Sequence, residues 1–213
     1  MDFKNLLIRL FTSLFLIFFL LIFISYFEEY IPFAIILIYS MIFYEILFFF
    51  KNKKRRSFVL FLYVFISLIS IEIYIIYFYE KVIFLYFILL ISCFDISSYI
   101  FGTLFGKKRI LPKISPNKTI FGVVAGLLLT LIISLSFNNL FYIFTFRTSV
   151  VFSVLIILFA FIGDVIESYY KRRFEIKNSS NILPGHGGIF DRLDSFVMGS
   201  IAMLIFNYFI WTK

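Results

Sequence analysis

Seven long, nearly unbroken apolar runs follow one another along this chain, and they constrain its fold more than any other feature. A helix needs about 20 consecutive, mostly apolar residues to cross the hydrocarbon core of a bilayer. In lipid such a run has to satisfy its own backbone hydrogen bonds, which favours helices over strands. We therefore predict an all-α polytopic membrane protein with about seven transmembrane helices. The predicted spans are Leu6–Phe27, Ile31–Phe50, Phe58–Tyr79, Val82–Gly102, Ile120–Phe137, Thr148–Tyr170 and Phe196–Trp211.

The composition excludes a soluble globular protein. Hydrophobic residues make up 62% of the 213 residues, whereas soluble domains contain about 45–50%. A soluble fold of this size has too little interior to bury so many large apolar side chains. The formal net charge of +8 is typical of a protein that lies against anionic lipid headgroups or phosphates. We expect the lipid bilayer as a partner, and we expect no nucleic acid.

Lysine and arginine gather in alternate loops, and this pattern predicts the orientation of the spans. Three loops hold five basic residues each, namely Lys51–Arg56, Thr103–Thr119 and Lys171–Ser195. The loops and the chain end on the opposite side hold only Lys81, Arg147 and Lys213. Basic loops are typically cytoplasmic. We therefore place the N-terminus and the three basic loops in the cytoplasm.

Acidic residues inside apolar runs mark candidate functional positions, because a charge at mid-membrane costs about 2.5–3.5 kcal/mol on insertion scales. Asp95 and Asp164 lie near the predicted cytoplasmic ends of their spans, where each adjoins a basic loop. Glu45 and Glu72 lie in earlier spans. For these two we expect an interhelical hydrogen bond or a protonated acid.

One predicted span carries a polar stripe at its cytoplasmic end. Asp164, Glu167, Ser168 and Lys171 are spaced i, i+3, i+4 and i+7, which places them on one face of a helix. Two acids, a hydroxyl and a base on one face are typical of a functional site. The structural alternative is a Lys171 side chain that reaches toward the interface and pairs with Glu167.

A glycine-rich segment precedes the last predicted span. Pro184, Gly185, Gly187 and Gly188 predict a tight turn whose backbone N–H groups are suited to phosphate. Asp191 and Asp194 follow at i, i+3 spacing, at the expected start of the last helix. Paired carboxylates of this kind are good ligands for Mg²⁺. Asp194 as an ordinary helix N-cap is the alternative.

The basic loop in the middle of the chain offers a second phosphate site. Ser115, Lys118 and Thr119 form a short polar stretch directly before a predicted helix, and helix N-termini bind anions. The alternative is a basic loop that only fixes topology. Together with Lys171 and Arg172, these residues could neutralise phosphates while the acids hold metal ions, which is the recurrent arrangement for phosphoryl-type transfer.

These segments together resemble the signature of phosphatidate cytidylyltransferases, the CDP-diacylglycerol synthases. The resemblance covers roughly residues 95–195. It is carried by Ser168-x-x-Lys171-Arg172, Lys177, Ser180, Leu183-Pro184-x-His186-Gly187-Gly188-x-x-Asp191-Arg192-x-Asp194, Ser115-Pro116-x-Lys118-Thr119, Asp95-x-x-x-Tyr99 and Phe105-Gly106-Lys107. It divides the chain into N-terminal transmembrane helices, 1–94, and a catalytic transmembrane region, 95–213, with cytoplasmic loops 103–119 and 171–195.

The resemblance implies an enzyme that transfers CMP from CTP to phosphatidate, giving CDP-diacylglycerol and pyrophosphate in phospholipid biosynthesis, with Mg²⁺ as cofactor and a second cation left open. It places the metal on Asp164 and Asp191. The implied catalytic residues are Asp164, Lys171, Arg172, Asp191 and Asp194. The implied substrate-binding residues are Ser115, Lys118, Thr119, Ser168, Lys177, Gly187, Gly188 and Arg192. The implied location is the plasma membrane of a bacterium, with the active site facing the cytoplasm.

Two positions depart from the family pattern. The family usually has Lys-Asp where this chain has Lys177-Asn178, and it often has Glu where this chain has Phe121. Two other functions remain open at this point: a related enzyme that uses CTP on another lipid, such as a polyprenol kinase, and an ion transporter that uses Asp95, Asp164 and Glu167. The oligomeric state also stays open, with a homodimer among the alternatives.

Overall fold

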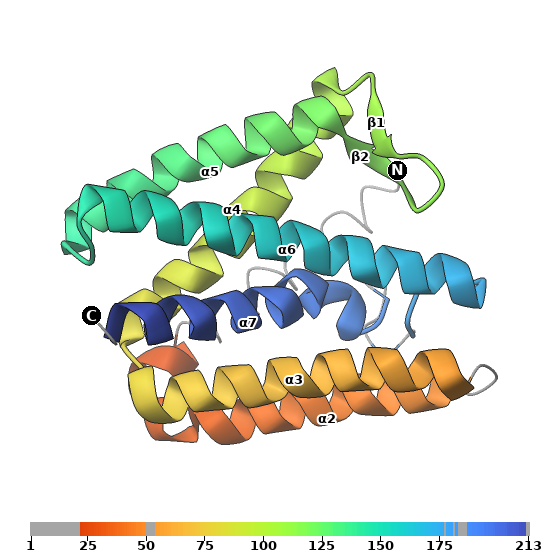
Figure 1. Ribbon diagram of the computed structural model, residues 1–213, viewed down its shortest axis with the longest axis horizontal. Coiled ribbons are helices and arrows are strands. Elements are labelled where there is room, and N and C mark those ends of the chain that lie inside the picture. Colours follow the sequence, from red (N-terminus) through yellow and green to blue (C-terminus); the bar gives the residue numbers. More distant parts are fainter. Residues whose placement is uncertain (1–21, 50–53, 177, 181, 183–186, 212–213) are drawn as a thin grey trace.

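The computed structural model describes residues 22–49, 54–176, 178–180, 182 and 187–211, and it is a bundle of long helices (Figure 1). Six helices in this part of the chain are long and apolar enough to cross a membrane, so the chain is an all-α polytopic membrane protein. A short 3₁₀ helix, η1 (Glu28–Tyr30), precedes them. The helices are α2 (Ile31–Phe49), α3 (Lys54–Phe78), α4 (Lys81–Phe105), α5 (Ile120–Phe141), α6 (Phe146–Phe174) and α7 (Phe190–Trp211).

The later six predicted spans each correspond to one of these helices. Most of the first predicted span, Leu6–Phe27, lies outside the described residues, so the total of seven helices stays a prediction. The last span was predicted to begin at Phe196, but α7 begins at Phe190. Its first turns therefore contain Asp191 and Asp194, as expected for the start of the last helix. The predicted start was too late because the first turns of α7 are polar, and the span was predicted from its apolar residues.

Helix α7 lies between two groups of helices, with α2 and α3 on one side and α6, α5 and α4 on the other (Figure 1). Hydroxyl groups link the groups across the apolar core, because a polar side chain inside lipid needs a partner. Ser67 on α3 contacts both Tyr39 on α2, at 2.5 Å between oxygens, and Ser200 on α7, at 2.8 Å. These contacts fix α7 against the N-terminal helix pair.

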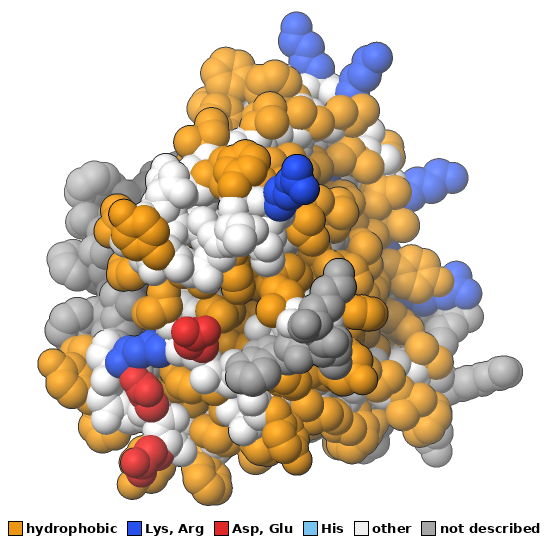
Figure 2. All heavy atoms as spheres, turned by 60° about the vertical axis from the view of Figure 1, so that its left-hand side comes forward, with side chains coloured by type: hydrophobic (Ala, Val, Ile, Leu, Met, Phe, Trp, Pro, Cys, Tyr) orange, Lys and Arg blue, Asp and Glu red, His pale blue; other side chains and the backbone are white. Residues whose placement is uncertain are grey.

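The chain segments that hold most of the Lys and Arg residues meet at one end of the bundle, on the right in Figure 1. This end contains the C-terminal end of α2, the N-terminal end of α3, the segment after α4, the end of α6 and the start of α7. Figure 2 brings the opposite end forward and shows a mostly hydrophobic surface, with Lys and Arg chiefly along its upper and right-hand edges. The cytoplasmic orientation of the basic end stays a prediction.

A small β-hairpin caps that end, and no strand was predicted there. Strand β1 (Arg109–Leu111) pairs antiparallel with β2 (Ser115–Thr119), with Arg109 opposite Thr119. The chain has to reverse between α4 and α5 in a stretch too polar to enter lipid, and the hairpin satisfies its backbone groups. Thr119 ends β2 and caps α5, since its Oγ1 accepts a hydrogen bond from Gly122 N at 3.1 Å.

Candidate active site

A cavity of about 520 Å³ lies at the basic end of the bundle. Five elements line it: α4, the hairpin, the start of α5, α6 and the start of α7. Its charged and hydroxyl-bearing lining residues include Asp95, Ser115, Lys118, Thr119, Asp164, Glu167, Lys171, Asp191, Arg192 and Asp194. The three sequence segments singled out for chemistry therefore converge on one space.

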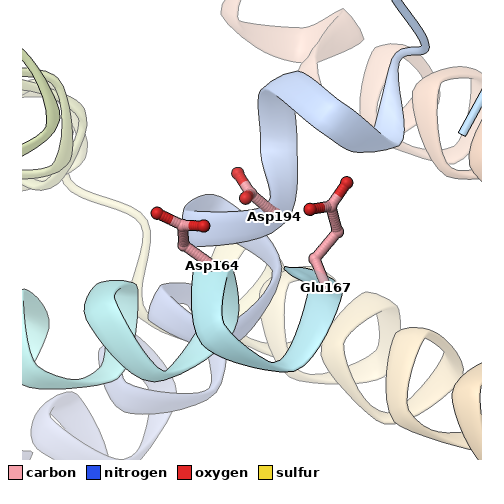
Figure 3. Close-up of side chains that lie close together, drawn as sticks. All are labelled: Asp164, Glu167 and Asp194. Carbon is pink, nitrogen blue, oxygen red and sulfur yellow. The ribbon is translucent and has the colours of Figure 1, made fainter. Parts of the chain in front are cut away.

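A close helix contact brings the carboxylates of α6 and α7 together. Gly163 packs directly on α7, where an added Cβ would lie 2.4 Å from the carbonyl oxygen of Asp194. Only a glycine permits this approach, which places the next residue, Asp164, beside Asp194. Asp164, Glu167 and Asp194 each offer a carboxylate oxygen within 4.8 Å of the others (Figure 3).

Two lysines stand among these carboxylates. Lys118 of the hairpin pairs with Asp164 Oδ2, and its Nζ lies 4.4 Å from the centre of the Phe161 ring. Lys171 Nζ lies 2.6 Å from Glu167 Oε2 and 3.3 Å from Asp191 Oδ1. The Lys171–Glu167 ion pair, which the sequence offered as a purely structural alternative, is present, and both of its residues line the cavity. The predicted common helix face is confirmed, and Ser168 Oγ on it donates to Asp164 Oδ1 at 3.3 Å.

Asp191 organises the glycine-rich segment before α7. Its carboxylate accepts hydrogen bonds from Ser179 N, at 3.0 Å to each oxygen, and from Gly188 N at 2.9 Å. Gly187 has φ 86°, a left-handed conformation that favours glycine. In this structure the Gly188 N–H donates to Asp191 Oδ2, and the role of Gly187 and Gly188 in binding phosphate stays a prediction.

The three-carboxylate cluster has the chemistry of a Mg²⁺ site. Mg²⁺ takes oxygen ligands at about 2.0–2.1 Å, and these three side chains bring carboxylate oxygens within 4.8 Å of one another. Glu167 is 1% exposed, and its Oε1 has no hydrogen-bond partner among the described residues. A buried carboxylate oxygen without a partner is costly unless a cation satisfies it. The predicted metal pair, Asp164 and Asp191, lines the same cavity and stays a prediction.

The remaining predicted site residues fall around the cavity. Arg172 points to the hairpin, where its Nε donates to the Ile114 carbonyl at 3.2 Å. Arg192 lines the cavity, and Lys177 lies outside the described residues. The N-cap alternative for Asp194 is wrong, since α7 starts at Phe190 and Asp194 lies within the helix.

Sequence reasoning left two acidic residues unassigned that the structure places at or beneath the site. Asp95, which had no assigned role in the predicted enzyme, lines the cavity and accepts from Ser195 Oγ at 3.3 Å. Glu45 makes the expected interhelical hydrogen bond, from Phe190 N of α7 at 3.0 Å. Its position under the glycine-rich segment had no local signal beyond a carboxylate in an apolar run.

Sequence comparison relates the chain to known proteins. The sequence model described as the cytidylyltransferase family matches residues 57–211. A Staphylococcus haemolyticus protein named phosphatidate cytidylyltransferase is 47% identical over 116 residues, which are 53% of this chain and 44% of that protein. A Staphylococcus epidermidis protein of the same name is 38% identical over 155 residues, 68% of this chain and 58% of that protein.

A Staphylococcus aureus protein, also named phosphatidate cytidylyltransferase, is 44% identical over 116 residues, with the same coverage as the first. The chain thus spans about half the length of the curated relatives it matches. The matched part includes the hairpin, α6 and α7, which between them supply most of the cavity. Because the family's sequence model covers most of its residues, the chain belongs to the cytidylyltransferase family.

Proposed function

We propose that this protein is a phosphatidate cytidylyltransferase. The observation that carries the proposal is the convergence of carboxylates and lysines from the hairpin, α6 and α7 on one cavity. The names of the relatives support the same substrate pair, CTP and phosphatidate. The cavity lies at one end of a membrane-spanning bundle, where a lipid phosphate and a water-soluble nucleotide can meet.

The proposed reaction is a displacement at phosphorus. An oxygen of the phosphatidate phosphate forms a bond to the α-phosphorus of CTP, and the bond from that phosphorus to the bridging oxygen of pyrophosphate breaks. CDP-diacylglycerol and pyrophosphate leave as products. Such a reaction depends on positioning and on neutralising negative charge, and it needs no protein nucleophile.

The side chains of the cavity suit these two tasks. Lys118 and Lys171 bring positive charge from two different elements, so they can hold phosphate groups in a fixed relation to each other. Ser115 and Thr119 add hydroxyl groups on the hairpin side. Asp164, with Asp191, Asp194 and Glu167 beside it, would hold Mg²⁺, which supplies charge neutralisation at the phosphates when bound.

The proposed setting is a bacterial plasma membrane with the cavity on the cytoplasmic side, where CTP is available. The clustering of the basic segments around the cavity supports this orientation. In this orientation the lipid acceptor reaches the site from the inner leaflet.

The decisive experiment uses the purified full chain in detergent with labelled CTP, phosphatidate and Mg²⁺. We expect a CTP- and Mg²⁺-dependent CDP-lipid, and release of pyrophosphate in equal amount. Folded protein that forms no CDP-lipid would refute the proposal. Offering polyprenol and other lipid alcohols or their phosphates in competition with phosphatidate tests the related CTP-dependent enzymes, and preference for one of those acceptors would replace phosphatidate as the substrate.

A further inference from the structure

Glu45 is a buried carboxylate that the proposed chemistry does not use. It lies on α2, outside the residues that match the family, and its side chain is fully buried at 0% exposure. Burying a carboxylate is unfavourable unless hydrogen bonds or an opposite charge compensate it. The hydrogen bonds that compensate it here come from residues just before α7 and from the first residue of α7.

Four hydrogen bonds reach this carboxylate from one segment of the chain. Ser179 Oγ donates at 3.1 Å to Oε2 and Ser180 Oγ at 2.6 Å to Oε1. The backbone N–H groups of Ile189 and Phe190 donate at 2.8 Å and 3.0 Å. Each carboxylate oxygen therefore receives one hydroxyl and one backbone donor.

The two backbone donors are the first N–H groups of α7. Phe190 is the first helical residue and Ile189 precedes it, so neither has a partner within the helix. Glu45 thus caps α7 from a different helix, and its negative charge sits at the positive end of the α7 dipole. The cap fixes where α7 begins and hence where Asp191 and Asp194 point.

Asp191 also accepts hydrogen bonds from this segment. It accepts from Ser179 N and Gly188 N, while Glu45 accepts from the side chain of Ser179 and from the residue after Gly188. Gly188 fits between them because it has no side chain. An added Cβ would lie 1.9 Å from Ser179 Oγ and 2.8 Å from Glu45 Oε2.

The geometry points to Glu45 as a positioning residue for catalysis: it holds Ser179 and Ser180 against the start of α7, so that the two aspartates of α7 face the cavity. The catalytic consequence rests on the proposed function, whereas the holding itself does not. The four residues that donate to Glu45 do not line the cavity, so Glu45 acts through the segment it holds.

The test compares Glu45→Gln with Glu72→Gln in the purified full chain. Glutamine keeps the shape of Glu45 but presents an NH₂ group to donors, so about half of the four hydrogen bonds cannot form. Glu72 on the neighbouring α3 is the matched control. Its Oε1 is buried like the carboxylate of Glu45, but unlike Glu45 it has no hydrogen-bond partner for this atom among the described residues. Amide hydrogen exchange is followed by mass spectrometry on peptides that cover residues 179–192, in the absence of substrates and Mg²⁺.

We expect exchange in these peptides to be about tenfold faster in Glu45→Gln and unchanged in Glu72→Gln, since hydrogen bonds to a charged acceptor are among the stronger ones. Peptides from α5 should exchange as in the wild type. Glu45→Asp keeps the charge, so its exchange rate in these peptides should lie between the rates of the wild type and Glu45→Gln. If Glu45→Gln does not fold, Ser180→Ala removes one donor to the same carboxylate and should raise exchange in the same peptides. Unchanged exchange in the folded variants would overturn the inference.

The activity assay then asks whether the holding matters for catalysis. In Glu45→Gln we expect kcat to fall at least about tenfold, with a higher Mg²⁺ concentration for half-maximal rate and a KM for phosphatidate within about twofold of the wild type. Glu45→Asp should recover part of kcat. Faster exchange with unchanged kcat would overturn the catalytic role. A wild-type protein without activity would refute the proposed function, and the exchange comparison would still decide whether Glu45 holds the segment.

Discussion

At the scale of single residues, the site is a set of carboxylates with two lysines among them. Asp164 takes part in three of its contacts, since it pairs with Lys118, accepts from Ser168 and belongs to the cluster with Glu167 and Asp194. Its removal should therefore affect metal binding and the position of Lys118 together.

The first prediction follows from that central position. Asp164→Asn should lower the rate of CDP-lipid formation by about 10²-fold or more, as loss of a single charged group at a transition state commonly does. Initial rates at saturating CTP and Mg²⁺ provide the measurement. Glu28→Gln is the control, because it breaks a similar carboxylate–lysine pair, with Lys81, away from the cavity. A rate above half that of the wild type in Asp164→Asn would contradict the assignment.

The second prediction concerns which carboxylates hold the ion. Mg²⁺ that binds only the folded protein should raise its melting temperature, by an amount equivalent to about 2.7 kcal/mol at one hundred times Kd. Asp194→Asn should lose most of this shift, because Asp194 belongs to the three-carboxylate cluster. Thermal unfolding in detergent, with Mg²⁺ and with EDTA, measures it. If only Asp164→Asn and Asp191→Asn lost the shift, the ion would belong to the pair that the family resemblance implies.

At the scale of elements, the approach of α6 to α7 is what assembles the cluster. Gly163→Ala would place a methyl group 2.4 Å from the Asp194 carbonyl, so the helices have to separate. We expect a loss of about 1–3 kcal/mol in stability, typical of overpacking, and a larger loss of activity than of stability. Thermal unfolding and the CTP assay on the same preparation test this.

Gly199→Ala is the matched control for that prediction. Gly199 also lies on α7, but an added Cβ there meets only the ends of the Ile91 and Phe87 side chains, at 3.0 Å and 3.1 Å. Those side chains can shift, whereas a backbone carbonyl on a packed helix cannot. Equal effects of the two substitutions would show that the α6–α7 contact has no special role in the site.

The elements also show which features of the fold and the site could be predicted from the sequence alone. The stripe of Asp164, Glu167 and Lys171 was predictable, because a helix fixes which spaced residues share a face. The hairpin was missed because β1 has three residues, too few for an alternating pattern to appear. The contacts of Glu45 with Ser180 and Ile189 could not be predicted either, since nothing in the local sequence relates residues so far apart in the chain.

At the scale of the whole molecule, the basic segments and the cavity share one end of the bundle. This end is predicted to face the cytoplasm. The alternation of basic loops was readable from the sequence because each loop is short and each span is long. The structure adds that the hairpin and the α5–α6 turn lie at opposite ends of α5 (Figure 1). The two sites therefore report on opposite faces of the membrane.

The last prediction uses these two positions to test the orientation. In a Cys93→Ser background, which removes the single cysteine of the chain, Lys113→Cys places a thiol on the exposed hairpin tip, and Tyr142→Cys places one in the α5–α6 turn at a site that is 89% exposed. A membrane-impermeant maleimide applied to intact bacterial cells should label only Tyr142→Cys, and permeabilised cells should show labelling of both. Because the carboxylates and lysines of the cavity lie at the hairpin end, labelling of Lys113→Cys in intact cells would place them on the outer face. CTP is not available there, so that result would contradict both the predicted orientation and the proposed reaction.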